Sequence, residues 1–70
     1  MLTVPQTRKW FTAQILDQSP DAKIEWILPL KRRKFPTGLV AVYGHAYVTA
    51  PGFAPRTMVV SSTKYGVSAY

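Results

Sequence analysis

The residues of this 70-residue chain with the clearest chemical potential are four consecutive cations, Lys31-Arg32-Arg33-Lys34. A run of like charge repels itself and adds nothing to a core, so it normally lies in solvent or against an anionic partner. Lys and Arg side chains placed beside phosphates release condensed counterions, which gives affinity without any base readout. The run therefore predicts either a phosphate-binding loop or a solvated loop that keeps a small protein soluble.

Aromatic residues accompany cations or a histidine on segments that alternate with period two. Trp10 shares its face with Arg8, and Tyr43 and Tyr47 share theirs with His45. Exposed rings of this kind are what the bases of a single strand stack upon, at about 1–3 kcal/mol per base. The alternative interpretation is that the rings fill the interior of a small barrel.

No constellation of residues supports catalysis or a metal site. His45 is the only histidine and cysteine is absent, so zinc ligands of the usual spacing are missing. Ser61 and Ser62 have no base in a fixed order, and Asp17 and Asp21 flank a turn. We expect a protein that is not an enzyme and that needs no cofactor.

The charge balance narrows the choice of partner. Nine Lys and Arg residues against three acidic residues give a formal net charge of +6, which is typical of nucleic-acid-binding proteins. Anionic membrane surfaces or acidic protein patches would also attract such a chain, and some small basic proteins are merely soluble cations. The hydrophobic fraction of 47% is typical of a folded domain and argues against intrinsic disorder.

The longest apolar run is too short to span a bilayer, and residues 1–5 lack the features of a signal peptide. We therefore expect a cytoplasmic protein with no membrane partner.

The pattern predicts a single domain, residues 1–70, built from four or five short strands. The expected strands lie at 8–16, 23–30, 39–49, 56–62 and, as a short last strand or a frayed tail, 63–70. A turn at 17–22 would join the first two strands in an antiparallel hairpin. A second turn at 36–38 and a Pro-rich loop at 50–55 would separate the others.

The strand expected at 23–30 has the cleanest alternation of the chain. Pro29 cannot donate to a ladder, so this strand should be an edge or should bend there. Gly44, inside the strand expected at 39–49, suggests a bulge or a sharp bend. The expected core residues are Ile24, Trp26, Leu28, Val40 and Val42.

These elements predict an all-β fold, a small antiparallel barrel or curled sheet of the OB or SH3-like kind. The alternative is a small α+β domain with a helix within 36–50. Exposed edges in so small a sheet would favour a homodimer, which would also supplement the core.

Residues 50–66 resemble a segment of the filamentous-phage single-stranded-DNA-binding proteins. The resemblance is carried by Ala50-Pro51-Gly52-Phe53, Thr57, Val59 or Val60, Ser61-Ser62, Lys64 and Gly66. It implies a small OB-like β dimer that coats single strands with basic residues and exposed aromatics. It also implies Phe53, Arg56 and Lys64 as contact residues.

Two other pieces are similar to a small phage inhibitor of bacterial RNA polymerase. They are Lys9-Trp10-Phe11-Thr12-Ala13 and the stretch from Tyr47 to Phe53. That protein is less basic and contains a central helix, and the resemblance implies a protein-binding function. Both resemblances are to phage-sized accessory proteins.

The favoured hypothesis is a non-catalytic protein that binds nucleic acid, with single strands preferred because aromatics accompany the charge. The alternative is a small inhibitor or adaptor that binds an acidic surface of a host enzyme such as RNA polymerase. The residues expected to contact nucleic acid are Arg8, Trp10, Lys31, Arg32, Arg33, Lys34, Tyr43, Tyr47, Phe53, Arg56 and Lys64.

Overall fold

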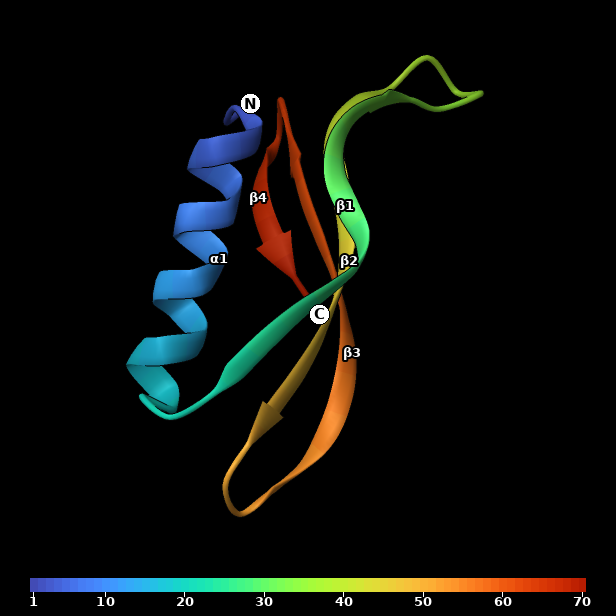
Figure 1. Ribbon diagram of the computed structural model, residues 1–70. Coiled ribbons are helices and arrows are strands. Elements are labelled where there is room, and N and C mark those ends of the chain that lie inside the picture. Colours follow the sequence, from blue (N-terminus) through green and yellow to red (C-terminus); the bar gives the residue numbers. More distant parts are fainter.

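A computed structural model describes residues 1–70 as one helix followed by a four-stranded antiparallel sheet (Figure 1). The elements are α1 (Val4–Gln18), β1 (Lys23–Lys34), β2 (Val40–Ala50), β3 (Phe53–Thr63) and β4 (Gly66–Ala69). The strands lie in the order β1-β2-β3-β4, so each pairs only with its neighbours in the chain. The fold is mostly antiparallel β as expected, but the sheet stays open and does not close into a barrel.

The strand predicted at residues 8–16 is wrong, because this segment lies in α1. Thr3 and Gln6 form a reciprocal capping box: Gln6 N donates to Thr3 Oγ1 at 3.2 Å, and Thr3 N donates to Gln6 Oε1 at 3.0 Å. Pro5 lies in the first turn, where its missing N–H costs nothing. These start signals outweigh the period-two alternation. The helix is 15 residues long, and it is neither long nor apolar enough to cross a membrane.

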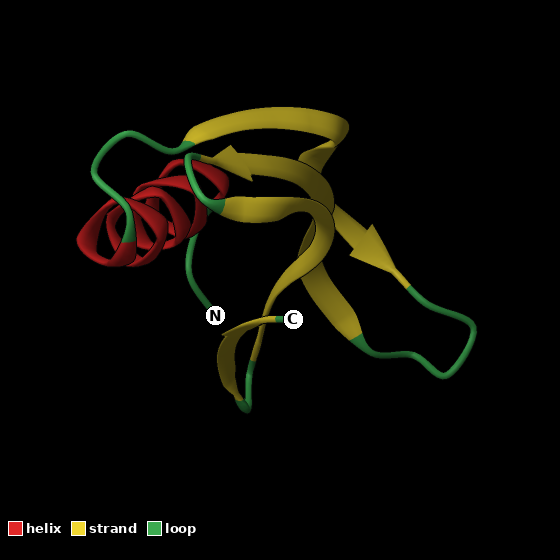
Figure 2. Ribbon diagram, turned by 90° about the horizontal axis from the view of Figure 1, so that it is seen from below, coloured by secondary structure: helices red, strands yellow, loops and turns green.

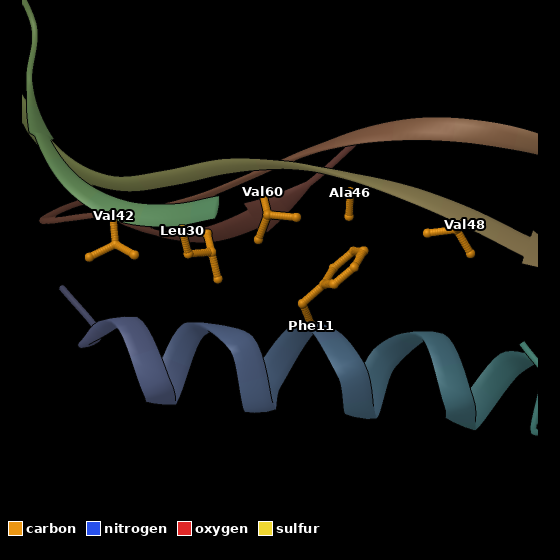
Figure 3. Packing of buried hydrophobic residues seen from close by; sticks show 6 residues of the cluster. All are labelled: Phe11, Leu30, Val42, Ala46, Val48 and Val60. Carbon is orange, nitrogen blue, oxygen red and sulfur yellow. The ribbon is translucent and has the colours of Figure 1, made fainter. Parts of the chain in front are cut away.

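The helix packs on one face of the sheet, and no second helix covers the other face (Figure 2). Phe11 points from α1 into the sheet (Figure 3), and its ring lies 5.5 Å from that of Trp26. The buried core consists of Phe11, Leu30, Val42, Ala46, Val48 and Val60. Of the expected core residues, Val42 is buried, Ile24 and Trp26 pack against the core, and Leu28 and Val40 are half-buried.

Two other connections differ from the prediction. The hairpin predicted between 8–16 and 23–30 is wrong, because β1 pairs instead with β2. The alternative of a helix within 36–50 is also wrong, since β2 occupies most of that range. The turn predicted at 36–38 is present, where Phe35 N donates to Leu39 O at 2.8 Å. This hairpin curves away from α1 and extends beyond the rest of the sheet (Figure 1).

Strand β1 is an edge strand, as Pro29 predicted, and it is bulged on both sides of Leu28. Gly44 of β2 lies opposite these bulges. A Cβ atom added at Gly44 would lie 2.7 Å from Leu28 O and 3.0 Å from Leu30 N. The glycine therefore allows the backbone of β1 to approach β2 closely where β1 bends.

Candidate nucleic-acid interface

The sheet face opposite α1 carries aromatic side chains along β2, one of the two central strands. Tyr43, His45 and Tyr47 are half-buried there, whereas Ala46 and Val48 alternate with them toward the helix and are buried. This alternation agrees with the sequence pattern. Because the sheet is open, the three rings lie on an uncovered face and do not fill a barrel.

Cross-strand neighbours give the two ends of this face different charges. Tyr43 lies opposite Lys31 of β1, whereas Tyr47 lies opposite Glu25. Directly paired residues of antiparallel strands share a face. A phosphate beside Tyr43 would therefore meet a cation, while one beside Tyr47 would meet a carboxylate, so the end nearer the β1–β2 hairpin suits an anion better.

Tyr43 is held by two aromatic neighbours. Its hydroxyl lies 2.8 Å from His45 Nε2, and the two ring centroids are 5.2 Å apart. On its other side, the ring of Phe35 meets it edge-on at 5.5 Å. The ring is thus fixed before any ligand arrives, which lowers the entropic cost of stacking.

Tyr70 joins the same face from the end of the chain. Val59 and Tyr70 exchange both backbone hydrogen bonds, at 2.8 and 3.0 Å, so they are directly opposed. Val59 in turn pairs with His45, and the Tyr70 side chain is 69% exposed. Nothing in the sequence pattern marks Tyr70, because residues 63–70 can equally be a frayed tail. Tyr43, His45, Tyr47 and Tyr70 are called the outer aromatic cluster below.

The four consecutive cations form the end of β1, so the loop predicted for them is wrong. Lys31, Arg32 and Lys34 are exposed, but Arg33 is half-buried. The Arg33 guanidinium donates from Nη2 to Pro29 O at 3.1 Å and from Nε to Tyr43 O at 3.4 Å. Arg33 therefore braces the bulged strand, and the other three cations are free to meet an anion.

The remaining predicted contact residues lie away from the outer aromatic cluster. Arg8 is exposed on α1, and Trp10 packs from α1 against the core. Phe53 and Arg56 belong to the first part of β3, and Lys64 lies in the β3–β4 turn with its Nζ 5.1 Å from the Tyr65 ring. The structure thus brings together Lys31, Arg33, Tyr43 and Tyr47 on one face. Arg32 and Lys34 pair with Val42 and Val40, so they lie on the other face of the adjoining hairpin.

An apolar cleft lies on the opposite side of the sheet, between α1 and the β2–β3 turn. Its volume is about 240 Å³, and ten of its 14 lining residues are hydrophobic. Trp10 and Ile15 come from the helix, Val48 from β2, and Phe53 and Met58 from β3. No part of the cleft had been suggested by sequence spacing, because it depends on the helix at residues 4–18.

No group of three His, Asp or Glu side chains is placed to hold a metal ion. His45 bonds to Tyr43 rather than to a serine or a carboxylate. Comparisons of the chain with protein-family models, curated proteins and solved structures give no match.

Proposed function

We propose that the protein binds single-stranded nucleic acid, without catalysis, on the outer face of its sheet. The observation that carries the proposal is the outer aromatic cluster beside an exposed basic hairpin. Bases stack on the rings and phosphates meet Lys31 on the same face. Arg32 and Lys34 add positive charge from the other face of the hairpin. Stacking tolerates every base because every base has a π-face, so we expect little sequence preference. A duplex hides its bases and should bind more weakly.

The resemblance of residues 50–66 to the filamentous-phage single-stranded-DNA-binding proteins supports the same class of ligand. The contact residues that this resemblance implies, however, do not lie at the outer aromatic cluster. Phe53 and Arg56 belong to the part of β3 next to the β2–β3 turn, whereas Lys64 lies in the β3–β4 turn. The proposed interface therefore uses Lys64 only as a peripheral cation, and it excludes Trp10 and Phe53.

The test is a titration of a fluorescently labelled oligonucleotide of about a dozen bases, a length within the usual site sizes, followed by anisotropy at low salt. Tyr43→Leu and Tyr47→Leu should each weaken binding by about tenfold through lost stacking. Trp10→Leu is the matched control, because Trp10 lies on the helix side of the sheet, and its affinity should equal that of the wild type. Equal losses for Trp10 and Tyr43 would refute the assignment of the face.

The basic hairpin also suits an acidic protein surface, which keeps the adaptor hypothesis as the second candidate. The β1–β2 hairpin extends beyond the rest of the sheet (Figure 1) and carries three exposed cations, as a charged recognition element would. The absence of oligonucleotide binding at low salt would reject the first proposal and leave this one. A homodimer, expected from the exposed sheet edges, is also part of the proposal.

A further inference from the structure

Phe53 is exposed although it borders an apolar cleft. Its side chain is 70% accessible, and its neighbours Gly52 and Ala54 are exposed as well. Gly52 has a φ of 82°, a conformation that glycine adopts without strain. The tight β2–β3 turn thus presents a large ring at one end of the molecule, next to a cleft of about 240 Å³. A single exposed ring is normal, but a ring that borders an apolar cleft forms a continuous apolar surface with it, and such surfaces mark interaction sites.

The edge of β3 beside this cleft has no partner strand. Strand β4 pairs only with residues from Val60 to Thr63, and Tyr70 pairs with Val59. The stretch from Phe53 to Met58 is therefore paired on the β2 side alone. Because Val59 directs its backbone groups toward Tyr70, alternation directs those of Thr57 outward. The cleft and an open backbone edge lie next to each other.

The charges of the chain are separated along its long axis. Seven of the nine cations lie in the first half of α1, at the end of β1 and in the β3–β4 turn, which gather at one end of the molecule (Figure 1). The other end has Lys23 and Arg56 together with all three acidic residues, and all five are exposed. The net charge of +6 is therefore concentrated away from the end that carries Phe53.

The separation of charges between the two ends of the molecule does not serve to stabilise α1. Helix α1 has no acidic residue in its first turn and no basic residue in its last, and Asp17 lies near the negative end of the helix dipole. Such placement is mildly destabilising. It nevertheless gives the cleft end both signs of charge, so two copies of that end are complementary to each other.

We infer that two copies of this chain associate through the end that carries the β2–β3 turn. Phe53 of each copy is then buried against the apolar cleft of the other copy. The mixed charges suit an isologous contact, in which the same patch meets itself about a two-fold axis. The open edge of β3 leaves this patch uncovered, and Pro55, which has no N–H, directs the contact to side chains and not to strand pairing. Each acidic side chain could then meet Lys23 or Arg56 of the other copy. The inferred contact identifies the surface of the proposed homodimer, and it does not depend on nucleic-acid binding.

In such a dimer the two basic hairpins point away from each other, so a strand that reached both would bind with added avidity. The contact must be small, because the molecule measures 40 × 18 × 16 Å and the end is narrow. Small contacts bury less area than stable interfaces need. We therefore expect a dimer whose population depends on protein concentration.

The test is sedimentation equilibrium of the protein without nucleic acid, from about 10 μM to about 1 mM, the range of weak affinities. The wild type should shift from monomer toward dimer. Phe53→Ser should remain monomeric at every concentration, with an unchanged circular dichroism spectrum. The matched control is Tyr65→Ser, which removes a ring that is 81% exposed at the basic end and should dimerise like the wild type.

A wild type that stays monomeric at about 1 mM, the weak limit of this scale, would overturn the inference. So would Phe53→Ser that dimerises normally, or Tyr65→Ser that does not. Because no oligonucleotide is present, these outcomes leave the nucleic-acid proposal untouched. Conversely, if the dimer forms as expected, the inference remains valid even if the protein binds no oligonucleotide.

Discussion

The hydroxyl oxygen of Tyr43 lies 2.8 Å from Nε2 of His45, two residues further along the same strand. Both side chains point to the uncovered face of the sheet, and neither is fully exposed. The hydrogen bond links two rings that would otherwise be free to rotate independently. The orientation of the outer aromatic cluster thus depends on a polar contact as well as on packing.

Tyr43→Phe should lower the free energy of unfolding by about 0.5–1.5 kcal/mol, because it removes a partner from half-buried His45. Tyr47→Phe is the matched control, since the Tyr47 hydroxyl forms no hydrogen bond within the chain. Urea denaturation followed by circular dichroism measures both. Identical stabilities of the two variants would show that the Tyr43–His45 bond contributes nothing.

Replacing Lys31, Arg32 and Lys34 together by Gln should weaken oligonucleotide binding and flatten its salt dependence. The slope should fall by about 0.7 per lost phosphate contact, and so by about 0.7 for Lys31 alone and by at most about 2 for all three. Arg33→Gln should behave differently, because its guanidinium is engaged by Pro29 O and Tyr43 O. It should reduce stability, with little change in the salt slope. A slope that falls as much per residue for Arg33 as for the others would contradict its bracing role.

Phe11→Ala should cost about 3–5 kcal/mol, as expected for a buried aromatic ring, which is comparable to the whole stability of so small a domain. The control is Leu16→Ala on the same helix, where the side chain is 39% exposed and the loss should be small. Thermal unfolding measures both. Equal losses would mean that α1 does not present Phe11 to the core.

Gly44→Ala should destabilise the protein by about 1–3 kcal/mol, as overpacking does. The added Cβ would lie 2.7 Å from a backbone oxygen, that of Leu28, and backbone cannot move aside as a flexible side chain can. The control is Ser68→Ala, at an exposed position of β4, which should change stability little. Urea denaturation measures both variants. A Gly44→Ala protein as stable as the wild type would show that β1 can separate from β2 without cost.

Strands β1 and β2 were largely predictable, because both alternate in step with burial. The first half of β3 is exposed throughout, and the sequence predicts a loop at 50–55, where this strand begins. In β2 the pattern places Tyr43 and Tyr47 on one face but leaves open whether that face is exposed or fills a barrel, and Pro29 predicts an edge or a bend in β1. Those inferences need only the two-residue period and the missing proline donor. The open face that carries the candidate site was therefore accessible in part from sequence.

The helix was not predicted, because Arg8 to Leu16 alternates by chance with a two-residue period. The signals that indicate it lie upstream, in the capping pair Thr3 and Gln6 and in Pro5. The two-residue period therefore places Phe11 on a strand, and no feature of the sequence indicates the cleft. The bracing role of Arg33 was also hidden, because a charge run has no internal feature that marks which member is engaged.

Each strand of the sheet pairs only with its neighbours in the chain, from β1 through β4. Every hairpin can therefore close over a short loop before any distant part of the chain is ordered. The main non-local step is the docking of α1, whose start is tied to β3 where Leu2 N donates to Ser62 Oγ at 2.8 Å. Pairing of neighbouring strands keeps the loops that must close short, which lowers the entropic cost of each closure. The rate-limiting step of refolding should therefore be the docking of α1 onto the four-stranded sheet. The assembly of the sheet from its hairpins should be faster.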